Sequence, residues 1–333
     1  MRKGNLLWTV SLGLLMSMVS LVNTGQGADC DRTSVGFTPL NDLGEGPYES
    51  YQGGLYPGGS NERPAEHEAA GLKLAYEIQP LDRDGNPDPV NGSIVLLSIG
   101  MSNTSQEFSV FRRLVDEDPD KNPQLIIVNG AQGGMSADRI LDPADGGTGT
   151  LFWETVNERL FRQGVTPNQV QVAWIKQADA GPTLQFPEDA LKLQEKFTII
   201  TQILKDRFPN VKLAYYSSRI YAGYATTMLN PEPFAYQSSF AVKWLVENQI
   251  NGDEELVFDP EKGKVKAPWL SWGPYLWADG LVPRSDELIW ECDDFQPDGT
   301  HPSPKGELKV ALMLLGFFKS DFTTTPWVLN HKQ

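Results

Sequence analysis

The stretch SIVLLSIGMSNTS at residues 93–105 decides the fold. Its apolar run, broken only by Ser98, is typical of a short strand that is buried on both faces. A turn follows, and residues 106–115 then have the apolar spacing of a helix. A serine between a buried strand and a helix lies where α/β folds place their chemistry, beyond the carboxyl end of a central strand. Ser102 is therefore a candidate nucleophile, although a helix N-cap serine has the same local sequence.

The same alternation of apolar strand and amphipathic helix continues along the chain. Further strands are expected at residues 124–129, 169–175 and 211–217, and helices at residues 64–79, 150–163, 187–208, 234–250 and 303–318. This order indicates right-handed βαβ units. We therefore predict an α/β fold, a three-layer α/β/α sandwich with a central, mostly parallel sheet.

The domain is expected to span residues 91–325. Residues 28–90 read as an irregular lead segment and a helix that pack on this domain. The tryptophan-rich stretch at residues 268–280 is expected to be a loop.

Residues 1–27 are typical of an export signal, because Arg2 and Lys3 precede an apolar run and small residues lead to Gly27. Cleavage there predicts a secreted or periplasmic protein with no membrane anchor. Removing Arg2 and Lys3 takes the formal net charge from -15 to -17. Such an acidic chain argues against nucleic acid or an anionic membrane as a partner, because both need basic surfaces.

The chain has two cysteines, Cys30 and Cys292. In an exported protein, such a pair is a plausible disulfide. It would join the start of the mature chain to the segment just before residue 298.

The motif DGTHPS at residues 298–303 is the second candidate for chemistry. An acid three residues before a histidine, in a turn ahead of a helix, can place a carboxylate beside an imidazole. Asp298 would then orient His301, and His301 would take the proton from a serine hydroxyl. His67 in the lead segment and His331 in the tail are less suited. A capped turn with an incidental histidine is the alternative.

With these blocks in order, residues 93–320 resemble the SGNH hydrolases, the family of GDSL-type esterases and lipases. The resemblance implies a flavodoxin-like fold, with Ser102 as nucleophile, His301 as base and Asp298 as its orienting acid. Met101 replaces the usual acid before the serine. The block from Asn129 to Gly134 implies that the Gly134 N–H joins the Ser102 N–H in an oxyanion hole.

The third block departs from the family pattern, because residues 174–177 read WIKQ in place of Gly-x-Asn-Asp. It resembles the carbohydrate-esterase branches more closely. The resemblance then implies that Gln177 supplies the side-chain donor of the oxyanion hole, with Lys176 as the alternative. It implies no metal and no organic cofactor.

The function implied is an exported serine esterase that works through an acyl-enzyme, with O-acetyl groups on carbohydrate as the expected esters. The partner is therefore a small-molecule or polysaccharide ester. Candidate substrate contacts are Asn103, Lys176, Trp272 and Trp277; Trp269, Tyr275, Tyr221 and Tyr224 could also stack on sugars or simply pack in the core. A lipase or thioesterase of the same family, and an inactive carbohydrate-binding protein on this scaffold, are the alternatives.

Overall fold

A parallel sheet forms the centre of the molecule in the computed structural model, which describes residues 1, 27–141 and 146–330. Its strands are β3 (Ile94–Gly100), β4 (Leu125–Asn129), β5 (Val170–Lys176), β6 (Leu213–Tyr216) and β7 (Trp269–Trp272). All neighbouring pairs are parallel, in the order β4-β3-β5-β6-β7. Counted along the chain, this is the flavodoxin-like order 2-1-3-4-5. The predicted fold class is confirmed.

The strands are buried on both faces because helices cover both. All seven residues of β3 and all seven of β5 are buried, as expected for central strands of a parallel sheet. Strand β7 was expected to be a loop, and that prediction was wrong. Its four residues, WLSW, pair with β6, but a run this short, followed by Gly273 and Pro274, has no usable periodicity.

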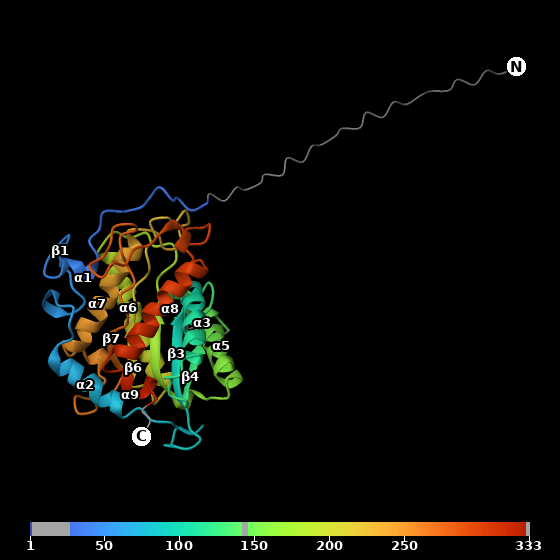
Figure 1. The fold of residues 1–333 in the computed structure, drawn as a ribbon, viewed down its shortest axis with the longest axis vertical. Helices are drawn as coiled ribbons and strands as arrows, with labels where there is room; N and C mark the ends of the chain where they lie inside the picture. Colours follow the sequence, from blue (N-terminus) through green and yellow to red (C-terminus); the bar gives the residue numbers. More distant parts are fainter. Residues whose placement is uncertain (2–26, 142–145, 331–333) are drawn as a thin grey trace.

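Two helical layers enclose the sheet (Figure 1). One layer holds α2 (Ala65–Tyr76), α3 (Ser102–Asp116), α8 (Pro304–Ser320) and α9 (Thr325–Val328), and the other α4 (Ala137–Ile140), α5 (Thr148–Arg162), α6 (Glu188–Arg207) and α7 (Phe234–Ile250). The ring of Phe108 on α3 stacks on Trp174 of β5, with centroids 5.4 Å apart. On the opposite face, Phe197 of α6 contacts Tyr216 of β6 at 5.3 Å.

The lead segment packs along the β7 side of the sheet, where the Tyr56 hydroxyl lies 2.9 Å from Ser271 Oγ. It contains the short elements α1 (Leu40–Leu43), β1 (Pro47–Tyr48), β2 (Tyr51–Gln52) and the 3-10 turn η1 (Pro57–Gly59). The 3-10 turns outside the lead segment are η2 (Pro167–Gln169), η3 (Glu254–Leu256) and η4 (Cys292–Asp294). Asp279 accepts hydrogen bonds from the Ser34 hydroxyl at 2.5 Å and the Val35 N–H at 2.7 Å. Leu40 and Tyr56 belong to the same hydrophobic core as the strands. The segment is therefore an integral part of the packed structure.

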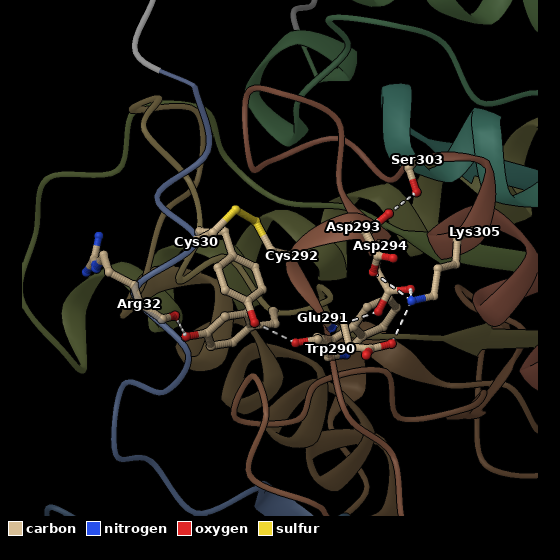
Figure 2. Close-up of a disulfide and its surroundings, with 11 residues drawn as sticks. Cys30, Arg32, Trp290, Glu291, Cys292, Asp293, Asp294, Ser303 and Lys305 are labelled. Atoms are coloured by element: carbon tan, nitrogen blue, oxygen red, sulfur yellow. Dashed lines mark hydrogen bonds and ion pairs between the residues drawn. A yellow bond between two sulfur atoms is a disulfide. The ribbon is translucent and has the colours of Figure 1, made fainter.

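A disulfide joins Cys30 to Cys292, as predicted, with Cα atoms 5.4 Å apart (Figure 2). Beside it, the Tyr221 hydroxyl donates to the Arg32 carbonyl at 2.7 Å, and the Tyr224 hydroxyl donates to the Trp290 carbonyl at 2.8 Å. The bridge thus attaches the lead segment to the stretch that precedes the Asp298–His301 loop.

The predicted export signal falls almost wholly on residues 2–26, which lie outside the described residues. Within the described part of the chain, none of the helices combines the length and the apolar character needed to cross a bilayer.

Replacing both cysteines by serine is expected to lower the free energy of unfolding by about 2–5 kcal/mol, because the bridge restricts the unfolded chain. Urea denaturation followed by circular dichroism measures the change as a lower midpoint. The wild-type protein under reducing conditions should match the double variant. Equal midpoints for oxidised wild type and the double variant would contradict a structural role for the bridge.

Candidate active site

The candidate site lies at the carboxyl edge of the sheet, where the strand order reverses between β3 and β5. This is the position at which open α/β sheets bind their ligands. Ser102 follows β3 directly and is the first residue of α3. The Asp298–His301 loop precedes α8, and α8 packs against α3. Residues about two hundred positions apart in sequence therefore meet at one edge.

Ser102, His301 and Asp298 form a continuous hydrogen-bonded row. The Ser102 Oγ lies 2.8 Å from His301 Nε2, and His301 Nδ1 lies 2.5 Å from an Asp298 carboxylate oxygen. This is the arrangement of a nucleophile, a base and an orienting acid. An incidental histidine in a capped turn does not explain this geometry. The N-cap interpretation of Ser102 does not hold either, because the N-cap of α3 is Met101.

The loop between Asp298 and His301 holds the carboxylate in place. Its second oxygen accepts the N–H groups of Thr300 and His301, each at 3.0 Å. Gly299 has φ +63°, and a Cβ there would lie 2.0 Å from the Tyr224 carbonyl oxygen, so the turn requires glycine. Burial alone would raise the pKa of Asp298, but the hydrogen bonds from His301 and Thr300 outweigh it and hold the pKa below its usual value. Asp298 is therefore an anion at neutral pH.

The first turn of α3 is tied to both sides of the site. The Asn103 amide donates to the Thr300 carbonyl at 2.9 Å, and the Thr104 hydroxyl donates to the Lys176 carbonyl at 2.6 Å. Asn103 was predicted to contact substrate, and it does line the cavity at the site. Its side-chain nitrogen, however, is used to hold the His301 loop against the helix.

Two backbone N–H groups can receive a developing oxyanion. Among the described residues, neither the Ser102 N–H nor the Gly134 N–H donates a hydrogen bond, and both residues line the cavity. Gly134 has φ +73°, a conformation that favours glycine. These are the two backbone donors that the resemblance implies.

Gln177 does not lie in the cavity, which corrects the expected side-chain donor. It is 1% exposed, its Nε2 donates to the Met135 carbonyl at 2.9 Å, and its Oε1 accepts the Ala178 N–H at 3.0 Å. Both ends of the amide are therefore engaged by backbone. Because Met135 follows Gly134, Gln177 instead positions the loop that presents the Gly134 N–H.

Lys176 is the other correction, as it can neither donate to the oxyanion nor contact substrate. It is fully buried, and its Nζ lies 2.5 Å from both carboxylate oxygens of Glu107 on α3, also fully buried. Burial lowers the pKa of Lys176 to about 8, against the opposing effect of Glu107. Burial likewise raises the pKa of Glu107.

The tryptophans predicted to contact sugars are core residues. Trp272 donates its indole N–H to the Leu55 carbonyl at 2.7 Å, and Trp277 donates to Glu232 at 2.8 Å. Both are buried and outside the cavity lining; Trp269, Tyr275, Tyr221 and Tyr224 are buried as well. The expectation of a stacking platform at Trp272 and Trp277 was therefore wrong, and packing in the core explains these aromatic residues.

The cavity beside the triad has a volume of about 310 Å³. It is lined by Met101, Ser102, Asn103, Gly134, Ser136, Arg139, Asp179, Ala180, Arg219, Leu229, Asn230, Thr300 and His301. Sequence reasoning missed Arg139, Arg219 and Asn230. A signal for Arg219 existed, because it follows strand β6 on the same carboxyl edge as Ser102.

An acidic cluster lies outside the cavity. Among the described residues, Glu291, Asp293 and Asp294 bring carboxylate oxygens within 4.8 Å of one another. Lys305 Nζ lies 2.6 Å from both Glu291 and Asp293 (Figure 2). Lys309 pairs with Asp294. Lysine ammonium groups therefore already compensate these carboxylates.

Glu107→Gln is expected to lower the free energy of unfolding by about 3–5 kcal/mol, because Lys176 is then buried without its anionic partner. Thermal denaturation measures the loss. The double variant Glu107→Leu/Lys176→Met should recover most of it, and Glu158→Gln, which breaks an exposed pair with Arg162, should have little effect. Similar melting temperatures for Glu107→Gln and Glu158→Gln would show that the buried pair does not matter.

No protein-family model matches the sequence, and neither does any curated protein. Among solved structures, the chain is similar to the salicylyl-acyltransferase SsfX3 from a tetracycline biosynthetic pathway, with 15% identity, a TM-score of 0.33, and coverage of 71% of this chain and 56% of that one. It is also similar to the periplasmic domain of a lipopolysaccharide acetyltransferase of Salmonella ser. Paratyphi A (13%, TM-score 0.37, 75% and 94%) and to the protein YxiM of Bacillus subtilis (12%, TM-score 0.33, 70% and 58%). The chain thus spans little more than half of the first and third of these proteins. The fold that the sequence resemblance implies, a parallel sheet between helical layers as in the SGNH hydrolases, is present.

Proposed function

We propose that this protein is a serine esterase of the SGNH hydrolase type that removes small acyl groups, acetyl above all, from carbohydrate. The observation that carries the proposal is the hydrogen-bonded row at the cavity, with 2.8 Å from Ser102 Oγ to His301 Nε2 and 2.5 Å from His301 Nδ1 to Asp298. These distances suit proton transfer from the serine without rearrangement.

The mechanism follows from the position of each atom. Ser102 Oγ attacks the acyl carbonyl carbon while its proton passes to His301 Nε2. Asp298 holds the ring and stabilises the imidazolium, and the N–H groups of Ser102 and Gly134 stabilise the oxyanion. His301 then gives the proton to the leaving alcohol oxygen. A water molecule, activated in turn by His301, releases the acid and restores Ser102.

The chemistry of the cavity favours a hydroxyl-rich alcohol over a lipid. Asp179, Arg219 and Asn230 line it, and each has a buried side-chain nitrogen or oxygen that finds no hydrogen-bond partner within residues 27–141 and 146–330. Leaving such polar atoms without a hydrogen bond against an alkyl chain costs free energy, whereas a polar ligand can form the hydrogen bonds that they lack. The disulfide supports the expected secreted or periplasmic location, because such bridges persist in oxidising compartments.

A lipase or thioesterase activity is the second candidate. Leu229 lines the cavity and is 44% exposed, and the neighbouring Met228 is 68% exposed. Together they offer an apolar rim for a longer acyl chain.

A fluorophosphonate probe tests the reaction itself. The probe is expected to label the wild-type protein at Ser102, and Ser102→Ala should abolish both labelling and acetyl-ester hydrolysis, because the variant lacks the hydroxyl that lies against His301 Nε2. Asp298→Asn should lower kcat by about 10³- to 10⁴-fold. Ser109→Ala, on the same helix but exposed, is the matched control. A wild-type protein that remains unlabelled would favour the inactive binding protein and end the proposal.

An acyl-length series tests the substrate class. We expect kcat/KM on 4-nitrophenyl esters to be highest for acetate and to fall by about tenfold or more at octanoate, because the polar cavity atoms disfavour an alkyl chain. Release of acetate from acetylated polysaccharide should accompany this profile. The reverse order of chain lengths would support the lipase instead.

A further inference from the structure

The Arg219 side chain is a buried cation that the proposed reaction does not use. It lies just after β6, is 1% exposed, and lines the cavity together with Ser102 and His301. Its Nε and Nη1 atoms are buried and have no hydrogen-bond partner among the described residues. Arginine remains protonated in proteins, so this is a charge held at the wall of the cavity.

The acids around Arg219 are already used by other groups. Glu107, Glu232 and Asp298 all act on it electrostatically. Glu107 binds Lys176 with both oxygens, Glu232 accepts from the Ala222 and Tyr236 N–H groups and the Trp277 indole, and Asp298 accepts from the His301 ring. None of them accepts a hydrogen bond from the guanidinium. The guanidinium therefore has three anions nearby but no acceptor among the described residues at Nε or Nη1, and buried donors without acceptors are costly, so the simplest explanation is an acceptor that a ligand supplies.

Acceptor atoms in the same cavity are unpartnered as well. Asn230 Oδ1 and Asp179 Oδ1 are buried, and no described residue donates a hydrogen bond to them. The other oxygen of Asp179 lies 2.5 Å from Lys196 Nζ, a cation that Asp179 shares with Asp138. Arg139, exposed at the same cavity, adds a second cation. The complementary ligand therefore presents one anionic group and several hydroxyl donors.

We propose that the cavity takes an acylated uronate, a sugar acid whose carboxylate binds the Arg219 guanidinium and whose free hydroxyls donate to Asn230 and Asp179. A carboxylate suits the guanidinium because an N–H···O bond between the two is charge-assisted. Hydrolysis then leaves the free uronate and the small acid. This inference rests on the proposed function and names the alcohol part of its substrate.

The test uses two substrates that differ only in charge, an O-acetylated methyl galacturonoside and its uronamide. Wild-type kcat/KM is expected to be at least about tenfold higher for the acid, in line with a charge-assisted hydrogen-bonded pair. Arg219→Gln should remove this preference by acting on the acid alone, Arg219→Lys should restore part of it, and Arg162→Gln, an exposed arginine on α5, should change nothing. Equal wild-type kcat/KM for the two compounds, or a loss in Arg219→Gln that is the same for both, would overturn the inference.

A binding measurement separates this inference from the esterase proposal. Calorimetry on the Ser102→Ala protein should show methyl galacturonoside binding at least about tenfold more tightly than its uronamide, with the difference lost when Arg219→Gln is added. If the fluorophosphonate fails to label wild type, the esterase proposal falls while this result can still stand. If labelling succeeds but the two ligands bind alike, the uronate inference alone falls. Should Arg219→Gln fail to fold, the comparison of the two ligands on Ser102→Ala still decides.

Discussion

The placement of the first turn of α3 is the constraint on which the site depends. Asn103 ties this turn to the His301 loop, Thr104 ties it to the end of β5, and Glu107 ties it to Lys176 beneath. A seryl oxygen can reach the imidazole at 2.8 Å only while the helix start and the loop keep this separation. Because a buried ion pair stabilises no more than a well-packed apolar pair but is costly to break, it sets position more than it adds stability.

The His301 loop is supported from the opposite side by segments far away in sequence. Cys292, just ahead of the loop, forms a disulfide with Cys30. The Tyr224 carbonyl lies against Gly299, and the Tyr224 hydroxyl donates to the Trp290 carbonyl. The lead segment thereby braces the acid and base, although it contributes no side chain to the cavity lining. This irregular stretch can hold its position because Leu40 and Tyr56 pack in the core, while hydrogen bonds to Asp279 and a covalent bridge add to that packing.

The sequence predicts the parts that repeat or that carry a motif. Buried strands such as β3 and β5 have long apolar runs, and the DGTH motif contains both partners of the serine within one turn. Strand β7 escaped prediction because four residues show no period. Gln177 was misplaced because its position after β5 does not say which way its side chain points, and here the backbone of Met135 captures it. Trp277 was misassigned because the sequence does not show whether a tryptophan ring packs in the core or is exposed and able to stack on a sugar.

Arg219 shows where a locally unfavourable residue is informative. A chain with 43 acidic and 28 basic residues has many acceptors for one arginine, yet in the part of the chain that the structure describes its Nε and Nη1 have none at the cavity. Burial lowers the pKa of Arg219, which means that the surroundings resist its charge, and the nearby acids only partly oppose this. Folding alone would favour an apolar residue of similar size at such a position. Exceptions to local consistency are expected at functional sites, where a ligand supplies the missing partner. In the proposed complex, the charge that is costly to bury in the free protein favours binding of an anionic substrate. The Arg219 side chain then provides both the affinity for this substrate and the discrimination against uncharged ones.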